Sequence, residues 1–150
     1  MKIQFLLGSK TDLDFTKKIT QHLDEWGIDY QIKVASAHKV PELVYNIVTQ
    51  NNKDIENLVY ITLAGRSNGL SGVVAANSIH PVIACPPHSD KSDFMVNINS
   101  TLQMPSDTPV LTVIDPQNAA MAAIRILALR DQDLQHKVTA HIQKIKQSFN

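Results

Sequence analysis

Residues 64–72, AGRSNGLSG, combine glycine, hydroxyl and guanidinium groups in a way that suits the binding of an anion. They contain three of the five glycines in the chain. An apolar run precedes them and a small-residue segment that is compatible with a helix follows, so free backbone N–H groups are expected at a positive helix end. Since glycine is scarce elsewhere, these positions are expected to need close approach or a positive φ.

A second turn, GSKTD at residues 8–12, offers hydroxyl groups and a carboxylate. Asp12 has two interpretations. It could accept hydrogen bonds from a ribose diol, or it could belong to a helix N-cap together with Ser9 or Thr11.

A third turn, SAHK at residues 36–39, places an imidazole beside an ammonium group. The positive charge of Lys39 favours the neutral, basic form of His38, which could then accept a proton near neutral pH. The other interpretation of His38 is a structural hydrogen-bonding residue.

In the glycine-rich turn, Arg66 could bind phosphate or carboxylate, or be a solvated loop charge.

The apolar runs between these turns predict which elements position them. Strands are expected at residues 3–7, 30–35, 58–63, 81–84 and 110–114. Helices are expected at residues 12–26, 41–50, 73–77 and 116–129. This alternation is typical of a single α/β domain, residues 1–150, with a parallel sheet covered on both faces. Ligands of such sheets bind at the carboxyl ends of the strands, where the three turns lie.

Residues 131–149 form one helix more than a five-stranded design needs. Its apolar stripe is narrow, with Leu134, Val138 and Ile142 among its members. Packing on its own domain and docking on a neighbouring subunit are both compatible with this stripe.

Composition excludes several classes of partner and site. The 14 basic and 14 acidic residues balance, which argues against nucleic acid or anionic lipid as a partner. No apolar run is long enough for a membrane span or a signal peptide, so a soluble cytoplasmic protein is expected. The single cysteine, Cys85, cannot form an intrachain disulfide and is expected to pack as a small apolar residue. No metal site is expected, and four histidines are expected to be structural or exposed: His80, His88, His136 and His141.

The turns, in this order, resemble the aminoimidazole ribonucleotide carboxylase and N5-carboxyaminoimidazole ribonucleotide mutase family of purine biosynthesis. The resemblance covers nearly the whole chain and includes PVIACPP at residues 81–87 and QMP at residues 103–105. The mutase branch has a histidine in the glycine-rich loop and an arginine after the SAH motif. This chain has neither, and Lys39 follows the motif, so it looks like the class of carboxylases that use CO2 directly. It departs from that class at Ser71 and Gly72, where Gly-Leu is more usually followed by Gly-Pro.

The resemblance implies a flavodoxin-like αβα sandwich, a homo-octamer and no cofactor, with a ribonucleotide and CO2 as substrates. His38 is expected to take a proton and Lys39 to assist it. The nascent carboxylate would be held by Lys39 and by the turn of Ser67, Asn68 and Gly69. Substrate binding is assigned to Gly8, Ser9, Asp12, Ser36, Ala37 and Arg66, with the phosphate charge matched by Arg66 or Lys39. The alternatives are the mutase, and a nucleotide-binding module without catalysis.

Overall fold

The computed structural model describes residues 2–149, which contain one five-stranded parallel sheet. The strand order is β2-β1-β3-β4-β5, with the chain crossing over after β2. This is the flavodoxin-like order, so the predicted α/β class is confirmed. The strands are β1 (Lys2–Leu7), β2 (Tyr30–Val34), β3 (Leu58–Leu63), β4 (Val82–Ala84) and β5 (Leu111–Thr112).

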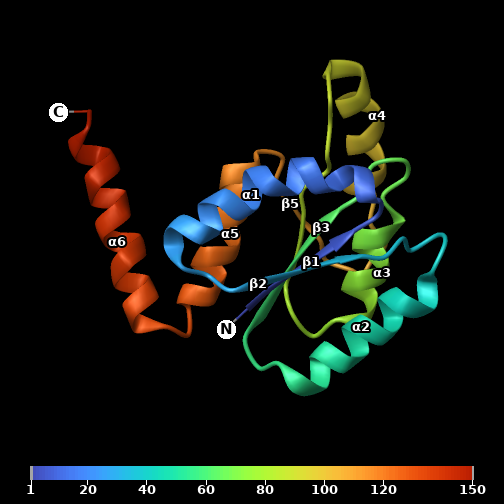
Figure 1. Cartoon of the computed structure of the whole chain (residues 1–150), viewed down its shortest axis with the longest axis horizontal. Helices are drawn as coiled ribbons and strands as arrows, with labels where there is room; N and C mark the ends of the chain where they lie inside the picture. Colours follow the sequence, from blue (N-terminus) through green and yellow to red (C-terminus); the bar gives the residue numbers. More distant parts are fainter. Residues whose placement is uncertain (1, 150) are drawn as a thin grey trace.

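Helices cover both faces of this sheet (Figure 1). On one face, α1 (Leu13–Trp26) packs against α5 (Pro116–Ala128), and the other face is covered by α2 (Pro41–Asp54) and α3 (Gly69–Asn77). The central strand β3 is buried along its whole length because it carries apolar clusters on both faces. The loops that leave the carboxyl ends of the strands are therefore held by a rigid centre.

The helix α1 illustrates how the sequence sets an element and its ends. Phe15, Ile19 and Leu23 recur on one face and are buried. Gly27 ends the helix in the left-handed conformation, with φ of 67°, which glycine adopts without steric cost. The predicted start at Asp12 is one residue early, because a short 3-10 turn, η1 (Lys10–Asp12), precedes the helix.

Several predicted bounds differ from the structure. The helix expected at residues 73–77 begins at Gly69, so part of the glycine-rich stretch is already helical. The second helix continues beyond residue 50 to Asp54, and the fifth strand keeps only two residues.

A whole helix, α4 (Lys91–Leu102), was not predicted. Its sequence mixes asparagine, serine and threonine with apolar residues, and these polar residues have modest helix propensity. Its start nevertheless carries a signal, because Asp90 caps the helix by accepting a hydrogen bond from the backbone N–H of Asp93 at 2.9 Å.

The last helix, α6 (Gln132–Gln147), lies at one side of the molecule and carries the C-terminus outward (Figure 1). It packs on α5, and the ring of His141 contacts that of Trp26 at the end of α1, with ring centroids 5.1 Å apart. Leu134 anchors its first turn against α5 and is buried, whereas Ile145 and Phe149 are exposed. Within residues 2–149, no helix is long and apolar enough to cross a membrane.

Candidate active site

A cavity of about 800 Å³ lies at the carboxyl ends of the strands. The loops after β1, β2, β3 and β4 line it, together with one residue of α1, one of α3 and two of α4. The lining residues are Gly8, Ser9, Thr11, Asp12, Phe15, Ser36, Ala37, His38, Lys39, Ala64, Gly65, Arg66, Ser67, Leu70, Pro87, His88, Ser89, Asp93 and Asn97. The structure thus brings all three predicted turns to one site.

The turn after β1 is held by a capping box. The backbone N–H of Ser9 donates to Oδ2 of Asp12 at 2.9 Å, and Oγ of Ser9 accepts from the backbone N–H of Thr11 at 3.3 Å. Burial raises the pKa of Asp12, and the hydrogen bond from Ser9 partly opposes that rise. Asp12 therefore has the capping role while its carboxyl group also lines the cavity.

The turn after β2 presents His38 and Lys39 from a tight loop. Its carbonyl at Ser36 accepts from the backbone N–H groups of Val40 at 2.9 Å and Lys39 at 3.3 Å. These bonds fix the backbone beneath the imidazole, so His38 projects from a stable position. Among residues 2–149, no carboxylate forms an ion pair with Lys39.

The turn after β3 does not offer all the donors that the sequence suggested. Asn68 is only 3% exposed, and Oδ1 of its amide accepts from Ser71, at 3.1 Å from the backbone nitrogen and 2.9 Å from Oγ. Its Nδ2 donates to Oγ1 of Thr101 at 3.0 Å, and its backbone N–H donates to Oγ of Ser100 at 2.9 Å.

The donors expected from Asn68 and Gly69 for a bound carboxylate already have partners within the protein, so their direct contact with a carboxylate stays a prediction. The backbone N–H of Gly69 already donates to the carbonyl of Ser67 at 3.0 Å, and neither Asn68 nor Gly69 lines the cavity. Asn68 instead joins the loop to α3 and α4. Ser67 is the member of this trio that reaches the cavity wall.

The glycines of this loop allow neighbouring side chains to approach the backbone closely, and they do not adopt an unusual backbone conformation. Among residues 2–149, Gly27 is the one glycine with a positive φ. A Cβ at Gly65 would lie 2.9 Å from Nδ2 of Asn97, and a Cβ at Gly72 would lie 3.2 Å from Sδ of Met104. The loop therefore needs glycine at residue 65 because α4 packs directly on its backbone.

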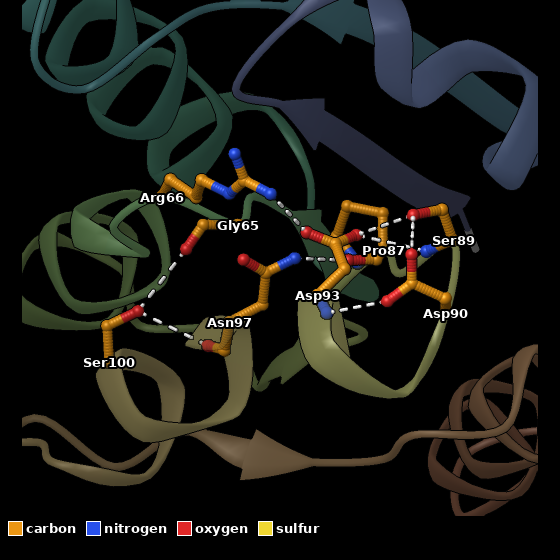
Figure 2. A network of polar contacts seen from close by, with 8 residues as sticks. All are labelled: Gly65, Arg66, Pro87, Ser89, Asp90, Asp93, Asn97 and Ser100. Atoms are coloured by element: carbon orange, nitrogen blue, oxygen red, sulfur yellow. Dashed lines mark hydrogen bonds and ion pairs between the residues drawn. The ribbon is translucent and has the colours of Figure 1, made fainter. Parts of the chain in front are cut away.

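Arg66 bridges the loop to the start of α4. Its Nη2 lies 2.8 Å from Oδ1 of Asp93, as Figure 2 shows, although 72% of the arginine side chain is exposed. The pKa of Asp93 is lowered, first by the backbone N–H of Ser89 and then by Arg66. An anionic ligand would have to compete with Asp93 for this guanidinium.

Two lining residues from α4, Asp93 and Asn97, were missed together with the helix that carries them. Asn97 is 4% exposed, and its Nδ2 donates to the carbonyl of Pro87 at 2.7 Å (Figure 2). Its Oδ1 has no hydrogen-bond partner within the described residues. The N-cap residue Asp90 is the sequence signal that would have indicated the start of α4 and therefore these two lining residues.

His88, which was expected to be structural or exposed, packs between the rings of Phe15 and Phe94 and also lines the cavity. Cys85 behaves as predicted, because it is fully buried and burial raises the pKa of its thiol to about 12. Among residues 2–149, no three histidine, cysteine or carboxylate side chains are grouped as a metal site requires.

The combination of this sheet order and these turns matches one known family. The family model described as AIR carboxylase matches residues 2–148. The chain belongs to the AIR carboxylase family. It is an enzyme of this type, as the sequence predicted.

Individual relatives of both branches are similar to the chain. A phosphoribosylaminoimidazole carboxylase of Archaeoglobus fulgidus is 46% identical over 138 residues, which cover 92% of this chain and 75% of the relative. An N5-carboxyaminoimidazole ribonucleotide mutase of Methanocaldococcus jannaschii is 40% identical, with coverage of 96% and 90%. The crystal structure of Treponema denticola PurE superposes with a TM-score of 0.90 at 36% identity and covers 99% of this chain and 93% of its own.

Proposed function

We propose that this enzyme carboxylates 5-aminoimidazole ribonucleotide at C4 with CO2, reversibly, in purine biosynthesis and without ATP, biotin or a metal. The observation that carries the proposal is the composition of one cavity wall. His38, Lys39 and Ser67 line the same cavity, and residues 64–72 contain no histidine that could serve a mutase relay.

The reaction needs a proton acceptor, and His38 fits this role. The aminoimidazole ring is electron-rich, so its C4 attacks the carbon of CO2 and a C–C bond forms. The electron pair of one C–O π bond moves onto oxygen, and the CO2 group becomes a carboxylate. C4 then carries a proton that must leave to restore the aromatic ring. His38 accepts it as a general base, and the same imidazolium returns it in the reverse direction.

The new carboxylate needs preorganised donors, and Lys39 and Ser67 supply them. Both line the cavity, and Lys39 has no carboxylate partner among residues 2–149. Such donors commonly contribute about 3 kcal/mol each to transition-state stabilisation. Asn68 and Gly69 act here through the loop that they hold, rather than by direct contact with the carboxylate.

The ribose phosphate is assigned to the turns after β1 and β2. Gly8, Ser9, Asp12, Ser36 and Ala37 all line the cavity. Oδ2 of Asp12 is used by the cap, so Oδ1 is the carboxylate oxygen left for a ribose hydroxyl. Arg66 and Lys39 remain the two candidates for charge compensation, and Arg66 would first have to leave Asp93.

The assembly that we propose is a cytoplasmic homo-octamer in which α6 reaches a neighbouring subunit. The outward direction of α6 and the exposure of Ile145 and Phe149 support a contact of this kind. Light scattering of the full chain and of a chain truncated before Asp131 tests it. An octamer that survives the truncation would contradict the role given to α6.

The function is tested by giving the purified protein 5-aminoimidazole ribonucleotide and its N5-carboxylated derivative in separate assays without ATP. We expect turnover of the first, with faster initial rates from dissolved CO2 than from bicarbonate. Activity confined to the second substrate would establish the mutase, a reaction for which a 40% identical relative is named. If the protein bound the product tightly but interconverted neither substrate with it, the protein would be a nucleotide-binding module without catalysis.

The role of His38 is tested by His38→Asn in the same assay. We expect turnover to fall by at least about a hundredfold, because general-base catalysis typically contributes that much. Near-normal turnover of this variant would contradict the proton-transfer role.

A further inference from the structure

His88 lies on the cavity wall and is clamped between two aromatic rings from different helices. Its ring centroid is 5.5 Å from that of Phe15 on α1 and 5.5 Å from that of Phe94 on α4. Such tilted and edge-on contacts stabilise one orientation of the imidazole. The loop after β4 thereby presents His88 toward the side of the cavity formed by α1.

The orientation of the ring leaves one nitrogen for a ligand. Nδ1 of His88 faces the carbonyl oxygen of Pro86, its own loop, at 3.4 Å. Nε2 lies on the opposite side of the ring, and the one hydrogen bond of this ring within residues 2–149 is that of Nδ1. With Nδ1 turned to a carbonyl acceptor, the ring is arranged to be a donor from Nε2 when it is protonated.

The charged side chains that line the cavity provide little net positive charge for a phosphate. Lys39 and Arg66 are balanced by Asp12 and Asp93, and Arg66 is already paired with Asp93. A phosphate ester carries about 1.5 to 2 negative charges at neutral pH. His38 has to be neutral to accept a proton. A further cation in the lining would therefore complement a phosphate beside Lys39, and His88 is the remaining basic side chain in it.

We propose that His88, as an imidazolium, binds the phosphate group of the ribonucleotide through Nε2–H. The hydroxyl-bearing residues Ser9 and Thr11 line the same cavity, and their hydroxyl groups suit the oxygens of the same phosphate. The proposal rests on the proposed function in one respect, namely that the ligand is a phosphate ester. It adds a binding group that the resemblance to the family does not assign.

Calorimetric titration of the full-length protein with ribose 5-phosphate tests the proposal without any turnover. His88→Phe keeps an aromatic ring between Phe15 and Phe94 but has no donor, and we expect it to weaken binding by about tenfold or more. His88→Lys restores a positive donor and should recover part of the affinity. His136→Gln, an exposed histidine on α6, is the matched control and should bind as the unaltered protein does.

In the enzyme assay, the same His88→Phe variant should raise KM for the ribonucleotide while kcat stays within about twofold. The reason is that the lost contact to the phosphate is made equally in the ground state and in the transition state. Unchanged affinity for ribose 5-phosphate in this variant would overturn the proposal, as would a failure of the unaltered protein to bind it. If His88→Phe does not fold, nitrogen NMR of the unaltered protein decides, since Nε2 of His88 must shift when ribose 5-phosphate is added. Because this binding is measured without carboxylation, it distinguishes a failure of the His88 role from a failure of the proposed reaction.

Discussion

The imidazole of His38 lies directly against the backbone of Gly69. A Cβ at residue 69 would be 2.9 Å from Nε2 and 3.0 Å from Cε1 of that ring. Real Cβ contacts are essentially never this short, so the ring and a side chain at residue 69 cannot both keep their places. The glycine in the loop after β3 therefore sets the position of the proposed base in the loop after β2.

Gly69→Ala is predicted to displace His38 and to lower kcat by about a hundredfold, because a shift of roughly 1 Å is enough for such a loss. Alanine at this first residue of α3 favours the helix, so Tm should not fall. Steady-state kinetics and thermal unfolding measure the two effects. Gly72→Ala is the control, since its Cβ would meet only the flexible Sδ of Met104 at 3.2 Å. Normal kcat in the Gly69 variant would contradict the prediction.

Asp12→Asn is predicted to separate stability from binding. Burial raises the pKa of Asp12, so the ionised carboxylate costs stability at pH values above its ordinary pKa of 3.8. Asparagine keeps an oxygen for the backbone N–H of Ser9 and removes that cost, so Tm at pH 7 should be equal or higher. KM for the ribonucleotide should rise by about tenfold, because a ribose hydroxyl loses a charged acceptor. An unchanged KM would show that Asp12 has only the capping role.

Asp93→Asn is predicted to change the acid dependence of stability. The lowered pKa of Asp93 means that its carboxylate stabilises the fold above pH 3.8, and that this stabilisation disappears as the pH falls through the lowered value. The unaltered protein should therefore have a higher Tm than the variant at about pH 6, and the two values should converge at about pH 2. Thermal unfolding at several pH values measures this difference, and a constant difference across the range would be inconsistent with it.

Leu134→Ala is predicted to loosen α6 from α5. Leu134 is 4% exposed and belongs to the apolar cluster that includes α1 and α5. Truncation of a buried leucine typically lowers the free energy of unfolding by about 2–5 kcal/mol. Urea unfolding measures the loss. Gln143→Ala, on the exposed part of the same helix, should change stability by less than about 0.5 kcal/mol. Equal effects of the two substitutions would mean that Leu134 is not the anchor.

The sheet and the location of the site could be predicted because they depend on local patterns. The buried strands appear as short apolar runs, and the rule that parallel strands meet their ligands at the carboxyl edge brings the three turns together. His38, Lys39 and Asp12 lie where that rule places them. The helix α4 lacks a strong apolar period, so the wall that it forms could not be seen in the same way.

The sequence also could not show which polar groups satisfy one another. Asn68 was interpreted as a donor to the ligand because it lies in a glycine-rich turn. Its partners Ser100 and Thr101 are more than thirty residues away and belong to the missed helix. The pairing of Arg66 with Asp93 depends on the same helix. Long-range hydrogen bonds of this kind are set by tertiary packing, which local propensity does not encode.

The burial of Cys85 makes this protein convenient for site-specific labelling. A thiol whose pKa is raised to about 12 is almost entirely protonated at neutral pH, and thiolates are the species that react with alkylating reagents. Since it is the single cysteine of the chain, a cysteine introduced on the exposed rim of the cavity, as in Ser89→Cys, would carry a fluorophore alone. Because the native thiol stays unlabelled, the fluorescence would report only from the introduced position, and ligand entry could be followed optically in real time.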